Sequence, residues 1–371
     1  MQIGVPREIK NQEYRVGLTP ASARELARRG HQVLIQKQAG AAVGLSDEAY
    51  MAAGATVCGD ASEVWSRAGM IIKVKEPQAA ERAMLRPGQI LYAYLHLAPD
   101  RDQAMALIAS GAVCIAYETI TGPAGGLPLL APMSEVAGRM SIQVAAASLE
   151  KPHGGMGLLL AGVPGVAPGH VAILGAGVVG THALQMAVGI GARVTILDTN
   201  VERLRQLDLI FGNRITTLSS SAHAIEKTVL SADAVIGAVL IPGAAAPRLV
   251  TREMIAAMKN GAVVVDVAID QGGCFETSRA TTHAQPTYVV DGVVHYCVAN
   301  MPGAVPRTST FALTNATLGH AITLAEKGWK RAMADDAHLR AGLNICEGRV
   351  TYEAVAHALG EPYVPAHDLL G

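Results

Sequence analysis

A glycine-rich turn is the clearest chemical signal in this sequence. The segment HVAILGAGVVG contains a short apolar run, 170–174, followed by Gly175, Gly177 and Gly180 and then by a helical stretch. In a strand–helix–strand unit the first glycine permits the tight turn, the second lets the backbone approach a pyrophosphate, and the third lets helix and strand pack closely. The N–H groups at the helix start then face the phosphates. The turn therefore predicts a dinucleotide-binding site.

The next strand ends in a carboxylate that bears on the choice of dinucleotide. Asp198 closes the run VTILD at about 20 residues past the glycines, where a carboxylate can accept hydrogen bonds from both adenosine ribose hydroxyls. Because a carboxylate there repels a 2′-phosphate, we predict NAD as the cofactor in preference to NADP. Arg203 keeps an alternative open, since it either binds that phosphate or lies on a solvated helix face beside the adenine.

Polar side chains also follow several predicted strands, at the positions where ligands bind in open α/β sheets. These residues are Arg15 after the first strand, Lys75 after MIIKV, His96 after ILYAYL, Glu118 after VCIAY and Asp270 after VVVDVA. An arginine for a carboxylate, a lysine for a carbonyl oxygen and a histidine with a carboxylate for proton transfer would equip a site for a 2-oxo or 2-amino acid. Lys73 shares strand parity with Lys75, so the pattern leaves the choice between the two lysines open.

The elements that must position these residues alternate between short apolar runs and amphipathic stretches, which indicates an α/β fold with parallel strands. The predicted strands are 2–5, 32–36, 70–74, 90–95 and 112–117 in the first third, then 170–174, 193–198, 215–218, 234–240 and 262–268. Thr19 before Pro20, and Ser46 before two acidic residues, indicate helix starts. The second series has the pattern of a Rossmann-type, doubly wound parallel sheet.

The chain is long enough for two domains, since it has 371 residues and half of them are apolar. A Gly- and Pro-rich stretch, TGPAGGLPLLAP, marks a crossover between them. We predict a catalytic domain over 1–129, a dinucleotide-binding domain over 130–306, and a mainly helical return to the catalytic domain over 307–371. The dinucleotide-binding domain is thus inserted into a discontinuous catalytic domain.

Composition excludes several classes of protein. The formal charge of −1 gives no basic surface for nucleic acid. The apolar region 154–197 is broken by prolines and glycines, so we expect no membrane span, and the N-terminus lacks a secretory signal pattern. The five cysteines are scattered without a C-x-x-C pair, and Cys114 and Cys297 lie in apolar runs. We therefore expect a cytoplasmic protein with buried, unreactive thiols and no structural zinc.

Several segments carry a family resemblance, in the same order along the chain. They are IGVPREIKNQEYRVGLTP, KVKEP, YLHLA, AILGAGVVG, DVAIDQGG and VANMPGAVPRTST. Over essentially its whole length the sequence resembles the alanine dehydrogenase / transhydrogenase NAD-binding family, and within it the alanine dehydrogenases. The resemblance implies a two-domain subunit, NAD as coenzyme, reversible oxidative deamination of L-alanine to pyruvate and ammonia, and a homo-hexamer.

The resemblance also assigns residues. It implies that Arg15 and Lys75 bind the substrate and that His96 and Asp270 are catalytic, which selects Lys75 over Lys73. Besides the three glycines, the positions it implies for NAD contacts are Ser134, Val178, Val179, Asp198, Arg203, Ser220, Val239, Leu240, Val267, Asp270, Arg279, Val298, Asn300 and Met301. Some relatives pair the acid matching Glu118 with a histidine to hold a divalent ion. Lys327 stands at the corresponding position here, so the resemblance implies no metal.

These assignments give a mechanism to test. Arg15 orients the alanine carboxylate, Lys75 stabilises charge on the carbonyl or carbinolamine oxygen, His96 moves protons, and Asp270 places the water or the amine when the domains close. Two other enzyme classes share this plan, a saccharopine dehydrogenase and the NAD(H)-binding part of a proton-translocating transhydrogenase. A third alternative is an NAD(H)-sensing protein without turnover.

Overall fold

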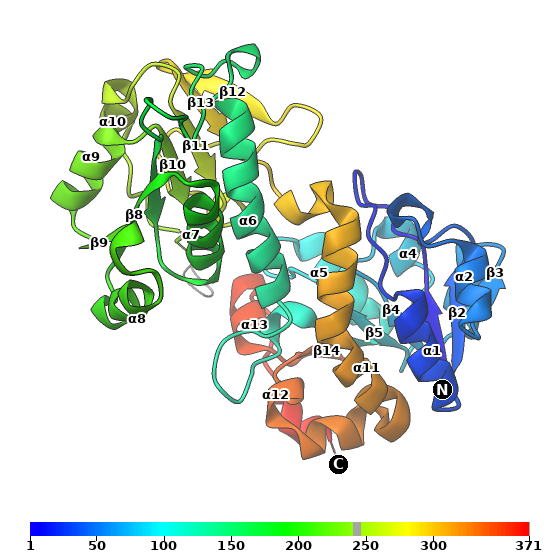
Figure 1. The fold of residues 1–371 in the computed structure, drawn as a ribbon. Coiled ribbons are helices and arrows are strands. Elements are labelled where there is room, and N and C mark those ends of the chain that lie inside the picture. Colours follow the sequence, from blue (N-terminus) through cyan, green and yellow to red (C-terminus); the bar gives the residue numbers. More distant parts are fainter. Residues whose placement is uncertain (240–245, 371) are drawn as a thin grey trace. The chain divides into compact units, whose positions relative to one another are not determined.

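The computed structural model describes residues 1–239 and 246–370 and divides into two compact α/β units (Figure 1). The first unit combines Met1–Met133 with Val305–Gly371, and the second is the intervening Ser134–Ala304. The predicted α/β class is confirmed, with each unit built on its own sheet. The first unit is discontinuous in sequence because the second is inserted into it.

The first unit contains an eight-stranded sheet in the order β15-β14-β6-β5-β4-β1-β2-β3. The pairs from β3 to β6 are parallel, whereas β14 and β15 add antiparallel strands at one edge. The bounds are β1 (Gln2–Val5), β2 (Gln32–Gln36), β3 (Thr56–Cys58), β4 (Met70–Ile72), β5 (Ile90–Ala93), β6 (Val113–Ala116), β14 (Leu343–Cys346) and β15 (Arg349–Val350). The part after 307 is mainly helical as predicted, and it also supplies the two edge strands that the sequence pattern did not reveal.

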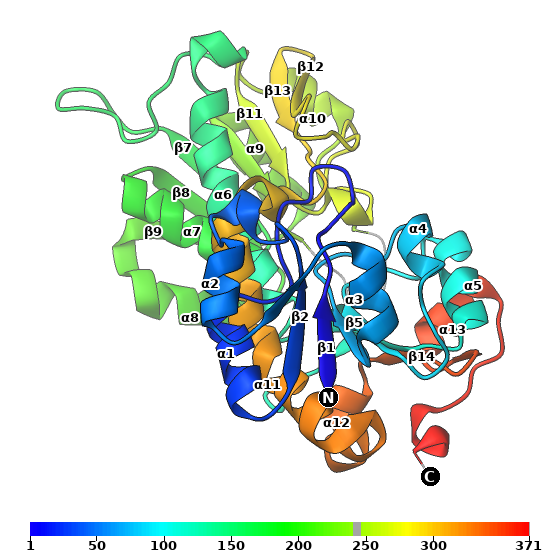
Figure 2. The same cartoon turned by 90° about the vertical axis from the view of Figure 1, so that its right-hand side faces the viewer.

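Helices cover this sheet, with α1 packed on β2 and α3 packed on β1, β2 and β3 (Figure 2). The helices are α1 (Pro20–Arg28), α2 (Asp47–Ala52), α3 (Ala61–Arg67), α4 (Ala79–Arg82), α5 (Arg101–Ser110), α11 (Pro306–Asp335), α12 (Ala337–Arg340) and α13 (Glu353–Leu359). The two predicted helix starts are present, because Thr19 caps α1 and Ser46 caps α2 by accepting a backbone N–H. Burial on both faces explains why the central strands are apolar throughout.

The second unit contains a seven-stranded sheet in the order β12-β13-β11-β10-β7-β8-β9, in which only β12 is antiparallel to its neighbour. Its strands are β7 (His170–Leu174), β8 (Arg193–Asp198), β9 (Ile215–Ser219), β10 (Ala234–Gly237), β11 (Val263–Asp266), β12 (Thr287–Val290) and β13 (Val293–Tyr296). Its helices are α7 (Val178–Ile190), α8 (Val201–Phe211), α9 (Ala222–Ser231) and α10 (Arg252–Ala257), and α6 (Ala131–Ser148) leads into it.

Both sheets reverse their winding at the first strand of the unit. In the first sheet β1 lies between β2 and β4, and in the second β7 lies between β8 and β10. Such a reversal leaves a crevice outside the carboxyl ends of the two central strands, where ligands bind in doubly wound folds. The loops after β1 and β4 in one unit, and after β7 in the other, are therefore the first places to look for a site.

No helix in the part of the chain that the structure describes is long and apolar enough to cross a membrane.

Candidate active site

The loop after β1 carries Arg15 in a buried ion pair. The Arg15 side chain is 1% exposed and meets the Glu13 carboxylate in a two-pronged contact, with Nε donating to Oε1 at 2.7 Å and Nη2 donating to Oε2 at 2.6 Å. Burial opposes ionisation of Glu13, but the hydrogen bonds and charge of Arg15 hold the pKa of that carboxyl below its usual value. Glu13 thus fixes the plane of the guanidinium, as recognition of a planar carboxylate requires.

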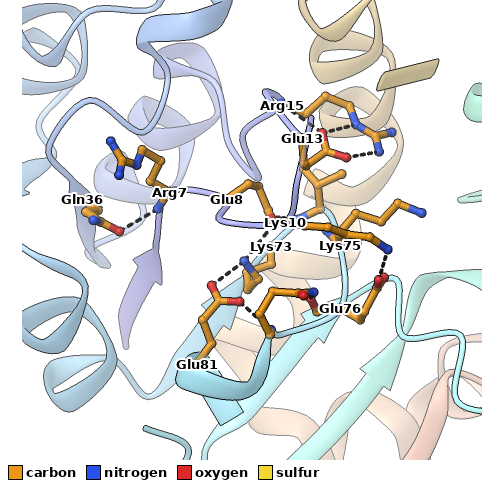
Figure 3. A network of polar contacts seen from close by, with 12 residues as sticks. Arg7, Glu8, Lys10, Glu13, Arg15, Gln36, Lys73, Lys75, Glu76 and Glu81 are labelled. Carbon is orange, nitrogen blue, oxygen red and sulfur yellow. Dashed lines mark hydrogen bonds and ion pairs between the residues drawn. The ribbon is translucent and has the colours of Figure 1, made fainter. Parts of the chain in front are cut away.

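The structure separates the two lysines that the sequence pattern could not. Lys73 follows β4 and is fully buried, and its Nζ donates to Glu8 Oε2 at 2.8 Å and to Glu81 Oε1 at 2.7 Å. Lys75 is partly exposed, and its side chain points in a different direction in Figure 3. Lys75 also lies near enough to Glu13 to lower the pKa of that carboxyl. Lys73 is therefore a structural residue, and Lys75 lies beside the Arg15 pair.

The Lys73 cluster fixes the backbone that carries Lys75. Glu8 Oε1 accepts the Val74 N–H at 2.7 Å, and Glu81 Oε2 accepts the Gln78 N–H at 2.7 Å in a capping box at the start of α4. Two buried carboxylates share one ammonium group, so burial and the charge of Glu81 raise the pKa of Glu8. The same two carboxylates raise the pKa of Lys73 against the opposing effect of burial, so its ammonium group stays charged.

His96 lies in a strained turn after β5, and the Glu118 carboxylate binds the backbone of this turn. The φ angle of His96 is 49°, in the left-handed region that costs a non-glycine residue about 1–3 kcal/mol. The Glu118 carboxylate accepts the His96 N–H at 2.7 Å and the Leu95 N–H at 3.1 Å. Gln103 donates to the Leu95 carbonyl, which fixes the other side of the turn. Glu118 therefore contacts the main chain of His96 in this structure.

A different carboxylate faces the imidazole. Glu76 Oε2 lies 3.7 Å from His96 Nδ1. Lys10 Nζ donates to the other oxygen of the same carboxylate (Figure 3). The Tyr94 ring lies 5.8 Å from the His96 ring, centre to centre. The His96 side chain remains 45% exposed, so a substrate can reach it. The unit 1 loops thus bring together a guanidinium, an ammonium and an imidazole at the carboxyl edge of one sheet.

The glycine turn of the second unit has the geometry that phosphate binding needs. Gly175 has a φ of 102°, which favours glycine, and a Cβ on Gly180 would lie 1.8 Å from the Gly175 carbonyl oxygen. A Cβ on Gly177 would meet no atom within 4 Å, so open space lies above that residue. Gly177 is also the N-cap of α7 and makes no side-chain cap, which leaves the first N–H groups of the helix for a ligand.

Asp198 and Arg203 both contact this turn. Asp198 Oδ2 accepts the Ala176 N–H at 2.6 Å, and its Oδ1 accepts the Asn200 N–H at 2.7 Å. Arg203 Nε donates to the Ala176 carbonyl at 3.0 Å, and its Nη2 donates to Thr181 Oγ1 at 2.7 Å. The arginine therefore lies across the turn with its donors engaged by the protein, which favours a positioning role over capture of a 2′-phosphate.

Most of the other predicted cofactor contacts lie just beyond the carboxyl ends of the parallel strands. Ser220 follows β9, Val239 follows β10, Val267 follows β11, and Val298, Asn300 and Met301 follow β13, while Val178 and Val179 begin α7. Two predicted contacts lie elsewhere, since Ser134 is in α6 and Arg279 is in the loop before β12, with its guanidinium 4.0 Å from the centre of the Tyr288 ring. Leu240 lies outside the described residues.

Asp270 lies in a short 3-10 turn (Ile269–Gln271) after β11 and is exposed. Asp266, at the end of β11, holds the ends of this loop by accepting the Ala268 N–H at 3.1 Å and the Cys274 N–H at 2.8 Å. Burial raises the pKa of Asp266 although these bonds oppose it. Asp266 thus holds the backbone on either side of Asp270, as the buried Glu8 carboxylate holds the backbone next to Lys75.

Cys114 and Cys297 are buried, as expected from their apolar runs, and the other three cysteines are also free and buried. Burial raises the pKa of Cys58 to about 11 and that of Cys274 to about 12, so these thiols are poor nucleophiles at neutral pH. Among the described residues, no group of three or more His, Cys, Asp or Glu side chains is arranged to hold a metal ion. Lys327, the residue noted opposite Glu118 in the sequence, pairs with Asp335 at 2.8 Å.

Sequence reasoning missed the carboxylates that support the site. Glu8, Glu13, Glu76 and Glu81 each contact a lysine, an arginine or a histidine near the candidate centre, yet none shows a periodic pattern. For Glu76 a signal exists, because it directly follows Lys75 in the segment KVKEP. Glu8 is 65 residues away from its partner Lys73, and Glu81 lies on the other side of a loop from it, so only the folded structure reveals these contacts.

Comparisons with known proteins agree over the whole chain. The family profiles "Alanine dehydrogenase/PNT, N-terminal domain" and "Alanine dehydrogenase/PNT, C-terminal domain" match residues 4–137 and 141–353. Relatives named alanine dehydrogenase are 60% identical in Halomonas elongata, over all of both chains, and 57% identical in Bacillus subtilis, over 100% of this chain and 98% of that one.

Solved structures give the same answer. An L-alanine dehydrogenase superposes with a TM-score of 0.95 at 52% identity, covering 97% of this chain and 99% of that one. The transhydrogenase from Sinorhizobium meliloti superposes with a TM-score of 0.81 at 25% identity, covering 95% of this chain and all of that one. This chain belongs to the alanine dehydrogenase/PNT family.

Proposed function

We propose that this protein is an NAD-dependent alanine dehydrogenase that catalyses the reversible oxidative deamination of L-alanine to pyruvate and ammonia. The observation that carries the proposal is the identity of 52–60% with proteins of that name across essentially the whole chain. The loops at the switch point of the first sheet support it, since they place Arg15, Lys75 and His96 at one sheet edge. A saccharopine dehydrogenase or a binding protein without turnover is the alternative to be tested.

Arg15 and Lys75 would bind and orient the substrate. Glu13 already holds the guanidinium plane of Arg15, so this group would meet the alanine carboxylate in a fixed orientation. Lys75 would supply the second positive charge, and would stabilise the negative charge that develops on the carbinolamine oxygen. Glu13 holds the Arg15 guanidinium and Glu8 holds the backbone beside Lys75, and such fixed positions would favour a near-attack orientation of the substrate.

His96 would move protons, and Asp270 would assist by holding the reacting groups. Bound NAD would supply the acceptor for the hydride of the alanine Cα, and the imine left behind would take up water and release ammonia. Each of the last two steps moves a proton, for which an imidazole on an exposed, well-held turn is suited. We propose Asp270 as the group that places the water or the leaving ammonia.

The second unit would bind NAD through the glycine turn. The open space above Gly177 and the uncapped N–H groups at the start of α7 suit a pyrophosphate, and the Asp198 carboxylate suits the adenosine ribose hydroxyls. Of the remaining predicted contacts that the structure describes, most follow parallel strands or begin α7, and Ser134 and Arg279 come from other elements. We further propose that the protein is cytoplasmic and forms a homo-hexamer. Light scattering of the purified protein tests the oligomeric state.

The experiment is a pair of initial-rate assays read by NADH absorbance. We expect NADH formation with L-alanine and NAD, NADH consumption with pyruvate, ammonia and NADH, and much weaker activity when NADP replaces NAD. Pyruvate should accumulate in equal amount to NADH. Turnover of saccharopine but not of alanine would overturn the substrate, whereas cofactor binding without turnover on a broad amino-acid panel would overturn the enzymatic proposal.

A further inference from the structure

We propose that Glu76 is a positioning residue that fixes the orientation and tautomer of the His96 imidazole, an inference that rests on the proton-transfer role given to His96 in the proposed function. Glu76 Oε2 lies 3.7 Å from His96 Nδ1. This oxygen is buried and has no hydrogen-bond partner among the described residues. A buried carboxylate oxygen without a hydrogen-bond donor costs free energy. A rotation of the His96 ring that brings Nδ1–H within hydrogen-bond distance is therefore favoured.

The other oxygen of Glu76 is already committed. Lys10 Nζ donates to Oε1, which sets the carboxylate plane and leaves Oε2 directed at the imidazole. Burial opposes ionisation, but the contact with His96 and the ammonium groups of Lys75 and Lys10 hold the pKa of Glu76 at about 2. Glu76 is therefore an anion at every pH at which the enzyme would work, and it can only accept.

An acceptor at Nδ1 decides which nitrogen does the chemistry. When Glu76 accepts from Nδ1–H, the neutral imidazole presents a bare Nε2 to the substrate and can take a proton there. The separation of 3.7 Å is longer than a hydrogen bond, and rotation of the half-exposed ring closes it, as is common for catalytic contacts before substrate binds. Glu118 fixes the His96 main chain, and Glu76 would fix the orientation of the His96 ring.

The sharpest test is Glu76→Gln, because Lys10 dictates how the new amide lies. The lysine can only donate, so it selects the amide oxygen, and the NH₂ group is turned towards His96 Nδ1. That inverts the contact and favours the tautomer protonated at Nε2. We expect kcat for alanine oxidation to fall roughly tenfold or more with KM for alanine nearly unchanged, since a misplaced tautomer harms proton transfer and leaves binding intact.

Two readouts separate this effect from a loss of structure. Two-bond ¹H–¹⁵N correlation spectra report the His96 tautomer directly, with His96→Asn used to assign the signal. The variant Glu76→Gln/Lys10→Met should recover much of the activity, because without the ammonium group the amide can turn its oxygen back to Nδ1–H. Glu150→Gln is the matched control, since Glu150 makes a similar 3.6 Å contact with His153 on the surface of the other unit.

Different outcomes test the positioning role of Glu76 and the proton-transfer role of His96. A low kcat for His96→Asn, no further loss in the Glu76→Gln/His96→Asn double variant, and an inverted tautomer in Glu76→Gln would support the inference. A Glu76→Gln variant with an unchanged tautomer, or with kcat within twofold of wild type, would overturn it and leave the dehydrogenase assignment standing. A His96→Asn variant with near wild-type kcat would instead overturn the proton-transfer role itself.

Discussion

Replacing each of the two neighbouring lysines by methionine should give opposite results. Lys73 is fully buried between Glu8 and Glu81, whose side chains are 2% and 3% exposed. Lys73→Met leaves two like charges in the core without their shared partner. Lys75 is partly exposed beside the Arg15–Glu13 pair, so Lys75→Met removes a charge that solvent reaches. The first substitution should destabilise the unit, and the second should stop the reaction.

The size of the stability loss follows from the burial of this cluster. Removing one partner of a buried ion pair costs about 3–5 kcal/mol, because an uncompensated charge remains. At about 1.4 kcal/mol for each factor of ten, this lowers the ratio of folded to unfolded protein by roughly 100- to 4,000-fold. For Lys75→Met the expected change in stability is about 0.5 kcal/mol or less, as for most surface substitutions.

Urea unfolding followed by tryptophan fluorescence measures this difference. The chain has two tryptophans, Trp65 and Trp329, and both belong to the unit that holds the cluster, so the signal reports that unit alone. The compensated variant Glu8→Gln/Lys73→Met/Glu81→Gln should regain much of the loss, because it removes the stranded charges. Equal unfolding midpoints for Lys73→Met and wild type, or equal losses for the two lysine variants, would refute the assignment of structural and substrate roles.

Four further predictions address the cofactor turn, the substrate carboxylate and acid stability. Gly180→Ala should abolish NADH binding measured by fluorescence, because its Cβ would lie 1.8 Å from a carbonyl oxygen, whereas Gly189→Ala in the same helix meets open space and should bind normally. Asp198→Gly should raise kcat/KM for NADP relative to NAD by about tenfold or more, and an unchanged ratio would count against the ribose contact. Arg15→Lys should raise KM for alanine by about tenfold or more, since a lysine cannot reproduce the two-pronged contact with Glu13; retention of the wild-type KM would exclude the carboxylate role. The pKa of Glu76 falls from 4.5 to about 2 on folding, so its stabilising effect is full above pH 4.5 and is lost as the pH falls towards 2. Acid titration should therefore cost wild type more stability than Glu76→Gln over this range, and parallel curves would contradict the shift.

The sequence predicted the elements well where their local pattern is complete. The strands 2–5, 32–36, 170–174 and 193–198 have the predicted bounds, because each is a short apolar run between strong turn signals. The strand predicted over 70–74 instead ends at Ile72. The Lys73 N–H still bonds the Tyr92 carbonyl of β5, while the Lys73 side chain pairs with two carboxylates. Such a long-range pairing has no local signature.

Short strands at a sheet edge or next to one were harder to predict. The structure adds β3, β12, β13, β14 and β15, which have two to four residues each and depend on a neighbouring strand for their hydrogen bonds. Propensity over such short stretches carries little information, because packing in the sheet decides their conformation.

Some residues of the candidate site could be predicted from local sequence pattern, and others could not. Residues that follow a strand could be found from the sequence, because the topology of a doubly wound sheet sends them to one edge. The carboxylates Glu8, Glu13 and Glu76 could not, since their roles depend on which cation the folded chain brings within reach. Glu118 illustrates the limit: its place after β6 was evident, but its partners are two backbone N–H groups and not the imidazole.

The most direct test of the proposed reaction uses L-alanine that carries deuterium at Cα. Proton NMR of the isolated dinucleotide should show one deuterium at the nicotinamide C4 for each pyruvate formed, together with a slowed chemical step in single-turnover kinetics. Deuterium released to water, with none in the dinucleotide, would contradict hydride transfer from alanine and with it the function proposed for this chain.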